Sequence, residues 1–206
     1  MRLAEATDRL QKIADPVLVA RGFRHRGRLE YFRTPTQERT ERIGFSVYLD
    51  RTGAARASFG VGIRFPSAER FRLESQDARA ATVGVPMHFL FLDRKYFDWT
   101  IVESTDLVSL EKDVRLALDR AEVFLSAYSS LEAVAAALES PEPRSWFTFD
   151  AAGRLETLAL LDCARGHPEK AIQRLEAALG EPAFELEKER APLARLKDHL
   201  SASKNG

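Results

Sequence analysis

The stretch RIGFSVYLDRTGAARASFGVGIRF, residues 42–65, decides the fold. Two runs in it, at about 42–50 and 56–65, alternate apolar residues with small or polar ones. Because successive side chains of a strand point to opposite faces, this period of two indicates strands with one buried face. The link DRTGAA supplies the aspartate and glycine that hairpin turns favour. We therefore expect an antiparallel hairpin, and its second strand has a core face of Ala57, Phe59, Val61, Ile63 and Phe65.

Two elements are predicted ahead of this hairpin. Residues 29–34 (LEYFRT) form a further strand that Pro35 ends, which completes an antiparallel meander. Residues 3–21 have apolar side chains at helical spacing and predict an amphipathic helix over the apolar face of the sheet. Pro16 either bends this helix or begins a second short one, because its ring removes one backbone hydrogen bond. Gly22 is the expected end of the helix.

The segment that follows the hairpin has a weaker pattern. Residues 66–87 contain scattered charge and suggest only a short helix at about 68–80. The runs HFLFL (88–92) and YFDWTIV (96–102) predict one or two further strands. The expected fold class is thus α+β, with an antiparallel sheet of three to five strands covered by helices.

From Asp106 the apolar spacing becomes helical and predicts a helix to about Tyr128. Ser130 is a good N-cap for a short helix at 131–138. The sequence SPEPRSWF, residues 140–147, contains two prolines and is the best candidate for a domain boundary. We therefore expect an α+β domain at residues 1–140 and an all-α helical tail at residues 141–206.

The tail has the pattern of a helical hairpin. Residues 156–179 read as two helices, and Pro168 is well placed at the start of the second. The small and apolar positions resemble one tetratricopeptide-type repeat, although Asp162 stands where that family has an aromatic residue. A closing helix is expected at about 184–200. Since stacked neighbours bury each unit of a solenoid, one repeat predicts a docked hairpin and no solenoid.

The composition is that of an ordinary globular protein, with 45% apolar and 30% charged residues. The single cysteine, Cys163, excludes an internal disulfide, which fits a reducing compartment. The first sixteen residues contain acids and no apolar core, so no signal peptide is predicted. The longest apolar runs are too short to span a bilayer. We expect a cytoplasmic protein without a membrane partner.

The zero net charge conceals an asymmetry between the two halves. Residues 1–100 contain 18 Lys and Arg against 12 Asp and Glu, and residues 101–206 contain 13 against 19. Neither half is basic enough for a strong nucleic-acid footprint.

The stretch RGFRHRGRLEYFR, residues 21–33, contains five arginines and has two interpretations. It could neutralise phosphates, with Tyr31 or Phe32 stacking on bases. Alternatively it is a solvated turn that leads into a strand, and nearby glutamates favour this interpretation. The candidate partner surface consists of Arg24, His25, Arg26, Arg28 and Arg33.

The sequence contains no recognisable catalytic constellation. Its four histidines do not have metal-ligand spacing, and it has no phosphate-binding glycine loop or nucleophile elbow. Cys163 precedes His167 by four residues, but buried structural cysteines are far commoner than reactive ones. We predict no catalytic, cofactor or metal site. Trp99 is expected in the core, and Trp146 could seat the tail on the first domain.

The first 140 residues resemble a bacterial family, domain of unknown function 4304. The matching motifs are DPVLVARGF, GFRHRGRLEYFR, the strand that ends GVGIRF, DWTIV, and FLSAYSSLEAVAAAL. The resemblance implies that the basic turn is a recurrent structural feature, and it supplies no catalytic residues. Small α+β bacterial domains of this kind are often suspected of being immunity proteins, which is an analogy of fold.

Three functional hypotheses follow. The first is a non-enzymatic, cytoplasmic protein-binding domain, with an immunity or antitoxin-like module as its specific form, because such a protein needs only a complementary surface. The second is weak nucleic-acid binding through residues 21–33. The third is an enzyme with an unrecognised site. The sequence leaves the oligomeric state open.

Overall fold

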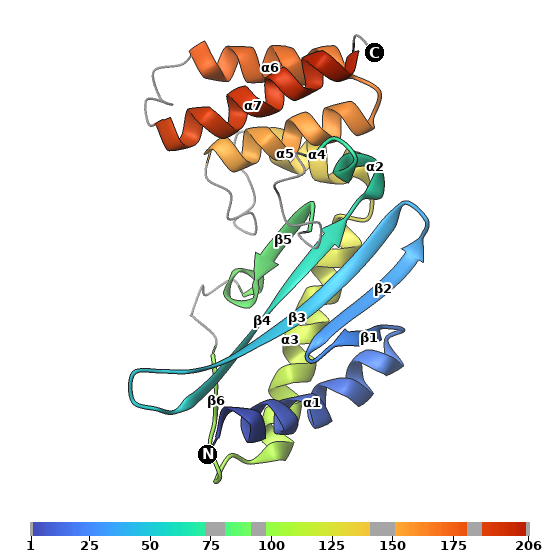
Figure 1. Ribbon diagram of the computed structural model, residues 1–206. Coiled ribbons are helices and arrows are strands. Elements are labelled where there is room, and N and C mark those ends of the chain that lie inside the picture. The colour runs from blue at the N-terminus through green and yellow to red at the C-terminus, as the bar shows by residue number, and fades with distance from the viewer. Residues whose placement is uncertain (1, 73–80, 92–97, 141–150, 181–186, 205–206) are drawn as a thin grey trace. The chain divides into compact units, whose positions relative to one another are not determined.

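The computed structural model describes residues 2–72, 81–91, 98–140, 151–180 and 187–204 (Figure 1). These residues group into two compact units. The first consists of Met1–Ile63 with Gly84–Ala127, and the second of Arg64–Val83 with Tyr128–Gly206.

A six-stranded sheet forms the centre of the first unit. The strands lie in the order β1-β2-β3-β4-β5, and β6 pairs antiparallel with the first residues of β4. The pairs β1·β2 and β2·β3 are antiparallel as well, so the predicted α+β class with an antiparallel sheet is confirmed. The strands are β1 (Arg24–Gly27), β2 (Glu30–Thr36), β3 (Arg39–Leu49), β4 (Ala55–Arg64), β5 (Val83–Pro86) and β6 (Trp99–Ile101).

The predicted core face of β4 is confirmed. All five predicted side chains are buried, four of them on β4 and Phe65 just after it, and the Trp99 ring stacks on Phe59 at a centroid distance of 6.1 Å. The turn before β4 is tight because Gly53 has φ +80° and Asp50 Oδ1 accepts hydrogen bonds from the backbone N–H of Thr52 and Ala54. The hydroxyl of Thr52 also donates to this carboxylate and lowers the pKa of Asp50.

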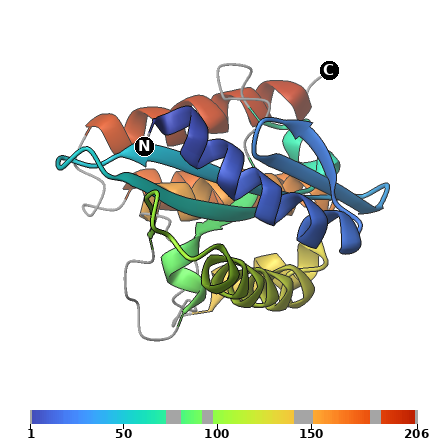
Figure 2. The same ribbon diagram turned by 90° about the horizontal axis from the view of Figure 1, so that it is seen from below.

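Helices α1 (Leu3–Ala20) and α3 (Leu107–Ala127) contact each other and complete the core of this unit (Figure 2). Pro16 lies inside α1, so the alternative in which it begins a second helix is wrong. Gly22 follows α1 with φ +81°, a conformation that glycine adopts without steric cost, and this confirms the predicted helix end. The predicted helix from Asp106 is confirmed within one residue at each end.

The strand predicted at residues 29–34 is present as β2, but its predicted end is wrong, and so is the strand predicted at HFLFL. Strand β2 continues through Pro35 to Thr36. Its register with β3 shifts between Arg33 and Thr36, and this irregular pairing accommodates Pro35, which has no backbone N–H to donate. Residues 88–90 of the run HFLFL lie on a 3₁₀ helix, η1 (Met87–Leu90), because Met87 and Leu90 share the buried side of one turn. The strand of this region is β5, in the segment to which the sequence assigned no strand. Residues 73–80 and 92–97 lie outside the described residues.

The second unit is helical. Its elements are α2 (Pro66–Glu69), α4 (Leu131–Glu139), α5 (Ala151–Ala164), α6 (Pro168–Gly180) and α7 (Glu187–Lys204). The predicted N-cap is confirmed, since Ser130 Oγ accepts from the Ala133 N–H. The predicted hairpin is formed by α5 and α6, joined at Gly166 with φ +82°, and the expected closing helix α7 packs on both. Most of the predicted boundary at 140–147, including Trp146, lies outside the described residues.

No single described helix has the length and apolar character needed to cross a membrane.

Candidate functional site

The arginine-rich stretch folds as a β-hairpin. Strand β1 pairs antiparallel with β2, with Arg24 opposite Phe32 and His25 opposite Tyr31. The chain reverses at Arg28 and Leu29, where Leu29 has φ 73° and a buried side chain. The basic segment is therefore an edge strand followed by a short turn, whereas the sequence analysis placed all of it in the turn.

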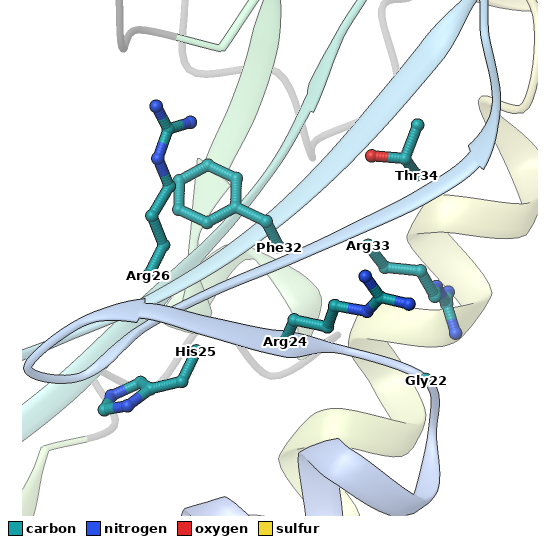
Figure 3. Close-up of a pocket in the computed structure, with 7 residues that line it drawn as sticks. All are labelled: Gly22, Arg24, His25, Arg26, Phe32, Arg33 and Thr34. Carbon is teal, nitrogen blue, oxygen red and sulfur yellow. The ribbon is translucent and has the colours of Figure 1, made fainter.

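The two sides of this hairpin differ in character. Arg24 lies directly opposite Phe32 in the strand pair, and the Arg26 guanidinium lies over the Phe32 ring, so Arg24, Arg26 and Phe32 lie on one side. We call these three residues the hairpin face. Figure 3 shows Arg26 and Phe32 on the same side of the hairpin and His25 on the other. The guanidinium carbon of Arg26 is 5.4 Å from the centroid of the Phe32 ring, which is cation–π distance.

The hairpin face borders a hollow of about 440 Å³. All four residues of β1 are exposed, and β1 is the terminal strand on its side of the sheet. A ligand can therefore reach the hollow from solvent. Its lining consists of Gly22, Arg24, His25, Arg26, Phe32, Arg33 and Thr34.

The cations of this stretch are not equivalent. Arg21 pairs with Asp119 and Arg28 pairs with Asp8, each at 2.6 Å. In the part of the chain that the structure describes, neither Arg24 nor Arg26 has an ion-pair partner. Only these two arginines of the predicted surface are therefore available as unpaired guanidinium groups for an external anion.

Arg33 has a structural role. Its Nε donates to Glu41 Oε2 at 2.5 Å, and its two terminal nitrogens donate to the Glu122 carboxylate at 3.0 and 2.8 Å. Glu41 is fully buried and also accepts a hydrogen bond from Arg39, which in turn donates to the Leu125 carbonyl at 2.8 Å. Arg33 and Arg39 each contact both Glu41 and α3, so the network attaches β2 and β3 to α3. The two arginines are needed because a buried carboxylate is costly unless cations pair with it.

Tyr31 anchors the inner side of the hairpin to α1. Its side chain is fully buried, and its hydroxyl donates to Asp15 Oδ1 at 2.5 Å. Burial raises the pKa of Tyr31, and the hydrogen bond to Asp15 adds to this effect. The ring of His25 stacks on Tyr31 at 5.0 Å. The hairpin face is thus presented on a support that is held to α1 and to α3.

Cys163 is not activated as a nucleophile. Burial, followed by the charge of Asp162, raises the pKa of Cys163 to about 11, so the thiol is protonated near neutral pH. His167 lies in the turn between α5 and α6, where its backbone N–H donates to the Asp162 carbonyl. The described residues contain no group of three His, Cys, Asp or Glu side chains placed to hold a metal ion.

A second charge cluster, in the helical unit, was not among the predicted sites. Asp162 is fully buried on α5, and its carboxylate lies 3.1 Å from Arg174 and 3.3 Å from Lys170, both on α6. The same two cations reach Glu139 of α4. The sequence feature that could have indicated this cluster is Asp162, a charged residue among the apolar residues of α5. The cluster joins three helices, and all its charges are matched within the unit.

Comparison of the chain with protein-family models, curated proteins and solved structures finds no match.

Proposed function

We propose that the protein is a protein-binding module whose partner docks an acidic segment on the hairpin face. One observation carries this proposal: Arg24 and Arg26 flank Phe32 on an exposed edge hairpin, while carboxylates of the same unit neutralise Arg28 and Arg33. The immunity or antitoxin-like role, the cytoplasmic location and membership of the domain of unknown function 4304 family belong to the proposal and rest on the sequence alone.

The chemistry of the hairpin face favours a partner that combines carboxylates with an apolar or aromatic side chain. Guanidinium groups bind carboxylates through paired, charge-assisted hydrogen bonds. The Phe32 ring offers a flat apolar surface between the two arginines. Interface hot spots commonly combine arginine with aromatic residues. A glutamate or aspartate next to a bulky side chain therefore fits both parts of this surface.

A nucleic acid fits the same surface less well. Two unpaired arginines release few counterions, so binding to phosphates would be weak at physiological salt. Asp8 and Glu30 also lie beside the hairpin, paired with Arg28 and Arg42 at 2.6 and 2.7 Å. Because each pair is locally neutral, it adds no positive charge for a continuous phosphate backbone, whereas an acidic peptide needs contact at only one or two points.

Selection of peptides from a random displayed library tests the proposal. The wild-type protein is the target, and the Arg24→Glu/Arg26→Glu double variant removes peptides that bind elsewhere. We expect acidic sequences with an aromatic or aliphatic neighbour, and at least about tenfold weaker binding to Arg24→Ala/Arg26→Ala. Arg28→Ala is the matched control, because Arg28 is a nearby exposed arginine that is already paired. Selection of no acidic peptide, or equal loss of binding in the control, would refute the proposal.

Fluorescence anisotropy with labelled mixed-sequence RNA and DNA measures the alternative. We expect no binding that depends on Arg24 and Arg26. Salt-dependent binding that both substitutions abolish, in a protein that selects no peptide, would assign the surface to nucleic acid instead.

A further inference from the structure

The side of α3 that faces away from its own unit carries exposed aliphatic residues. Val108 is 76% exposed, Leu116 is 50% exposed and Val123 is 51% exposed. The buried side chains of the helix, such as Val114 and Leu118, point the opposite way. With 3.6 residues per turn, the three exposed aliphatic side chains lie within an arc of about 80° on the helix surface. They form a stripe along one side of the helix, in which successive aliphatic residues are about two turns apart.

Two charged residues lie within the same stripe. Lys112 falls between Val108 and Leu116, and Asp119 falls between Leu116 and Val123. Lys112 has no ion-pair partner among the described residues. The carboxylate of Asp119 contacts Arg21 at 2.6 Å but keeps 64% of its side chain exposed, so it can accept a second cation. We call Val108, Lys112, Leu116, Asp119 and Val123 the α3 outer face.

The order of these residues is self-complementary under a two-fold rotation. If a second copy of α3 runs antiparallel, with the axis beside Leu116, Val108 meets Val123 of the second copy and Lys112 meets Asp119 of the second copy. Both pairs occur twice, because residue i contacts j and j contacts i in such an interface. Leu116 meets its own equivalent near the axis. Apolar residues therefore oppose apolar residues, and each cation opposes an anion.

Arg115, the other cation near the axis, does not prevent this pairing by charge repulsion. Arg115 lies on the flank of the stripe, where it would approach its own equivalent. Its guanidinium group donates to Glu111 Oε1 at 2.9 and 2.7 Å within the same helix. Its charge is thus matched before a second copy arrives, and the flank presents paired charges of both signs.

We infer that the α3 outer face binds a second copy of this chain in an antiparallel, two-fold symmetric helix pair. Val108 and Val123 are about 22 Å apart along the helix, so the contact extends over most of its length. This surface shares no residue with the hairpin face, and the two proposals can fail independently.

Sedimentation velocity of the full chain, from about 5 to about 500 µM, provides the first test. We expect a concentration-dependent monomer–dimer equilibrium. Leu116→Arg places two cations at the axis and should weaken dimerisation at least about tenfold. Leu49→Arg is the matched control, because Leu49 is 51% exposed on β3 and lies outside the α3 outer face. A wild-type protein that stays monomeric throughout, or a dimer that Leu116→Arg leaves intact, would overturn the inference.

A charge exchange tests the antiparallel register. Lys112→Glu and Asp119→Lys should each weaken self-association, because each variant opposes like charges in both pairs. An equimolar mixture of the two variants should dimerise again, since every glutamate or aspartate then faces a lysine. The double variant Lys112→Asp/Asp119→Lys should also recover. Circular dichroism of each variant shows whether the helix is retained. A folded mixture that remains monomeric would refute the register.

Discussion

Replacing Arg33 by methionine should destabilise the first unit far more than the same change at Arg24. Methionine keeps an unbranched apolar stem over the Phe23 ring, where the Arg33 guanidinium carbon now lies 4.4 Å from the centroid. It removes the hydrogen bonds that Arg33 donates to Glu41 and to Glu122. Glu41 would remain fully buried, with Arg39 as its one remaining cation.

The magnitude follows from the burial of the pair. Removing one partner of a buried ion pair costs about 3–5 kcal/mol. Arg33 is itself 23% exposed and Glu41 retains a second partner, so we expect about 2–3 kcal/mol. Arg24 is exposed and without an ion pair in the described residues, and Arg24→Met should change the free energy of unfolding by less than about 0.5 kcal/mol.

Urea denaturation of variants in a Trp146→Phe background measures the difference. Trp99 is then the only tryptophan, and it is buried in the first unit beside Phe59. With a slope of about 1–3 kcal/mol per molar urea, Arg33→Met should lower the midpoint by about 0.7–3 M. A shift as small as that of Arg24→Met would refute the assignment of Arg33 to structure.

Three further predictions concern other parts of the chain. Burial raises the pKa of Cys163 to about 11, so a thiol-reactive disulfide reagent at pH 8 should modify the native protein far more slowly than the unfolded one; equal rates would contradict this. The hydrogen bond from Lys170 lowers the pKa of Glu139, so the pair stabilises the fold above the ordinary carboxyl pKa of 4.5 and loses this effect as pH falls below it. Glu139→Gln should therefore be less stable than wild type at pH 7, with a gap in urea midpoint that closes on acidification; a gap that persists at low pH would be contrary evidence. Gly53→Ala should cost about 1 kcal/mol because of its positive φ, whereas Gly180→Ala, at the end of α6 and facing open space, should cost nothing in the same urea assay.

Periodicity made much of the fold predictable. The alternating apolar residues of β3 and β4 and the helical spacing in α1 and α3 each report a buried face within a few consecutive residues. The N-cap at Ser130 was equally local, because a hydroxyl and an amide three residues apart suffice to define it.

Elements without a buried face were harder to predict. Strand β1 exposes all four of its residues, so its sequence has no apolar alternation, and only pairing with β2 makes it a strand. The run HFLFL has strand-like composition, yet η1 buries Met87 and Leu90 on one side of a single turn. Intrinsic preference is a weak guide where tertiary packing decides.

The sequence predicted which stretch of the chain contains the candidate site, but not which of its arginines form the exposed, unpaired surface. The five arginines of residues 21–33 look alike in sequence. Arg33 differs from Arg24 because it reaches Glu122, 89 positions along the chain, and no local pattern records that contact. The two unpaired arginines become visible only after such pairs are assigned.

The most direct test of the hairpin face is an NMR titration of the isotopically labelled full chain with a selected acidic peptide. The account predicts that amide shifts change at Arg24, Arg26, Phe32 and their strand neighbours in β1 and β2, and that the Arg24→Ala/Arg26→Ala protein shows none of these changes. Shifts confined to other elements, or unchanged binding by the double variant, would contradict the account.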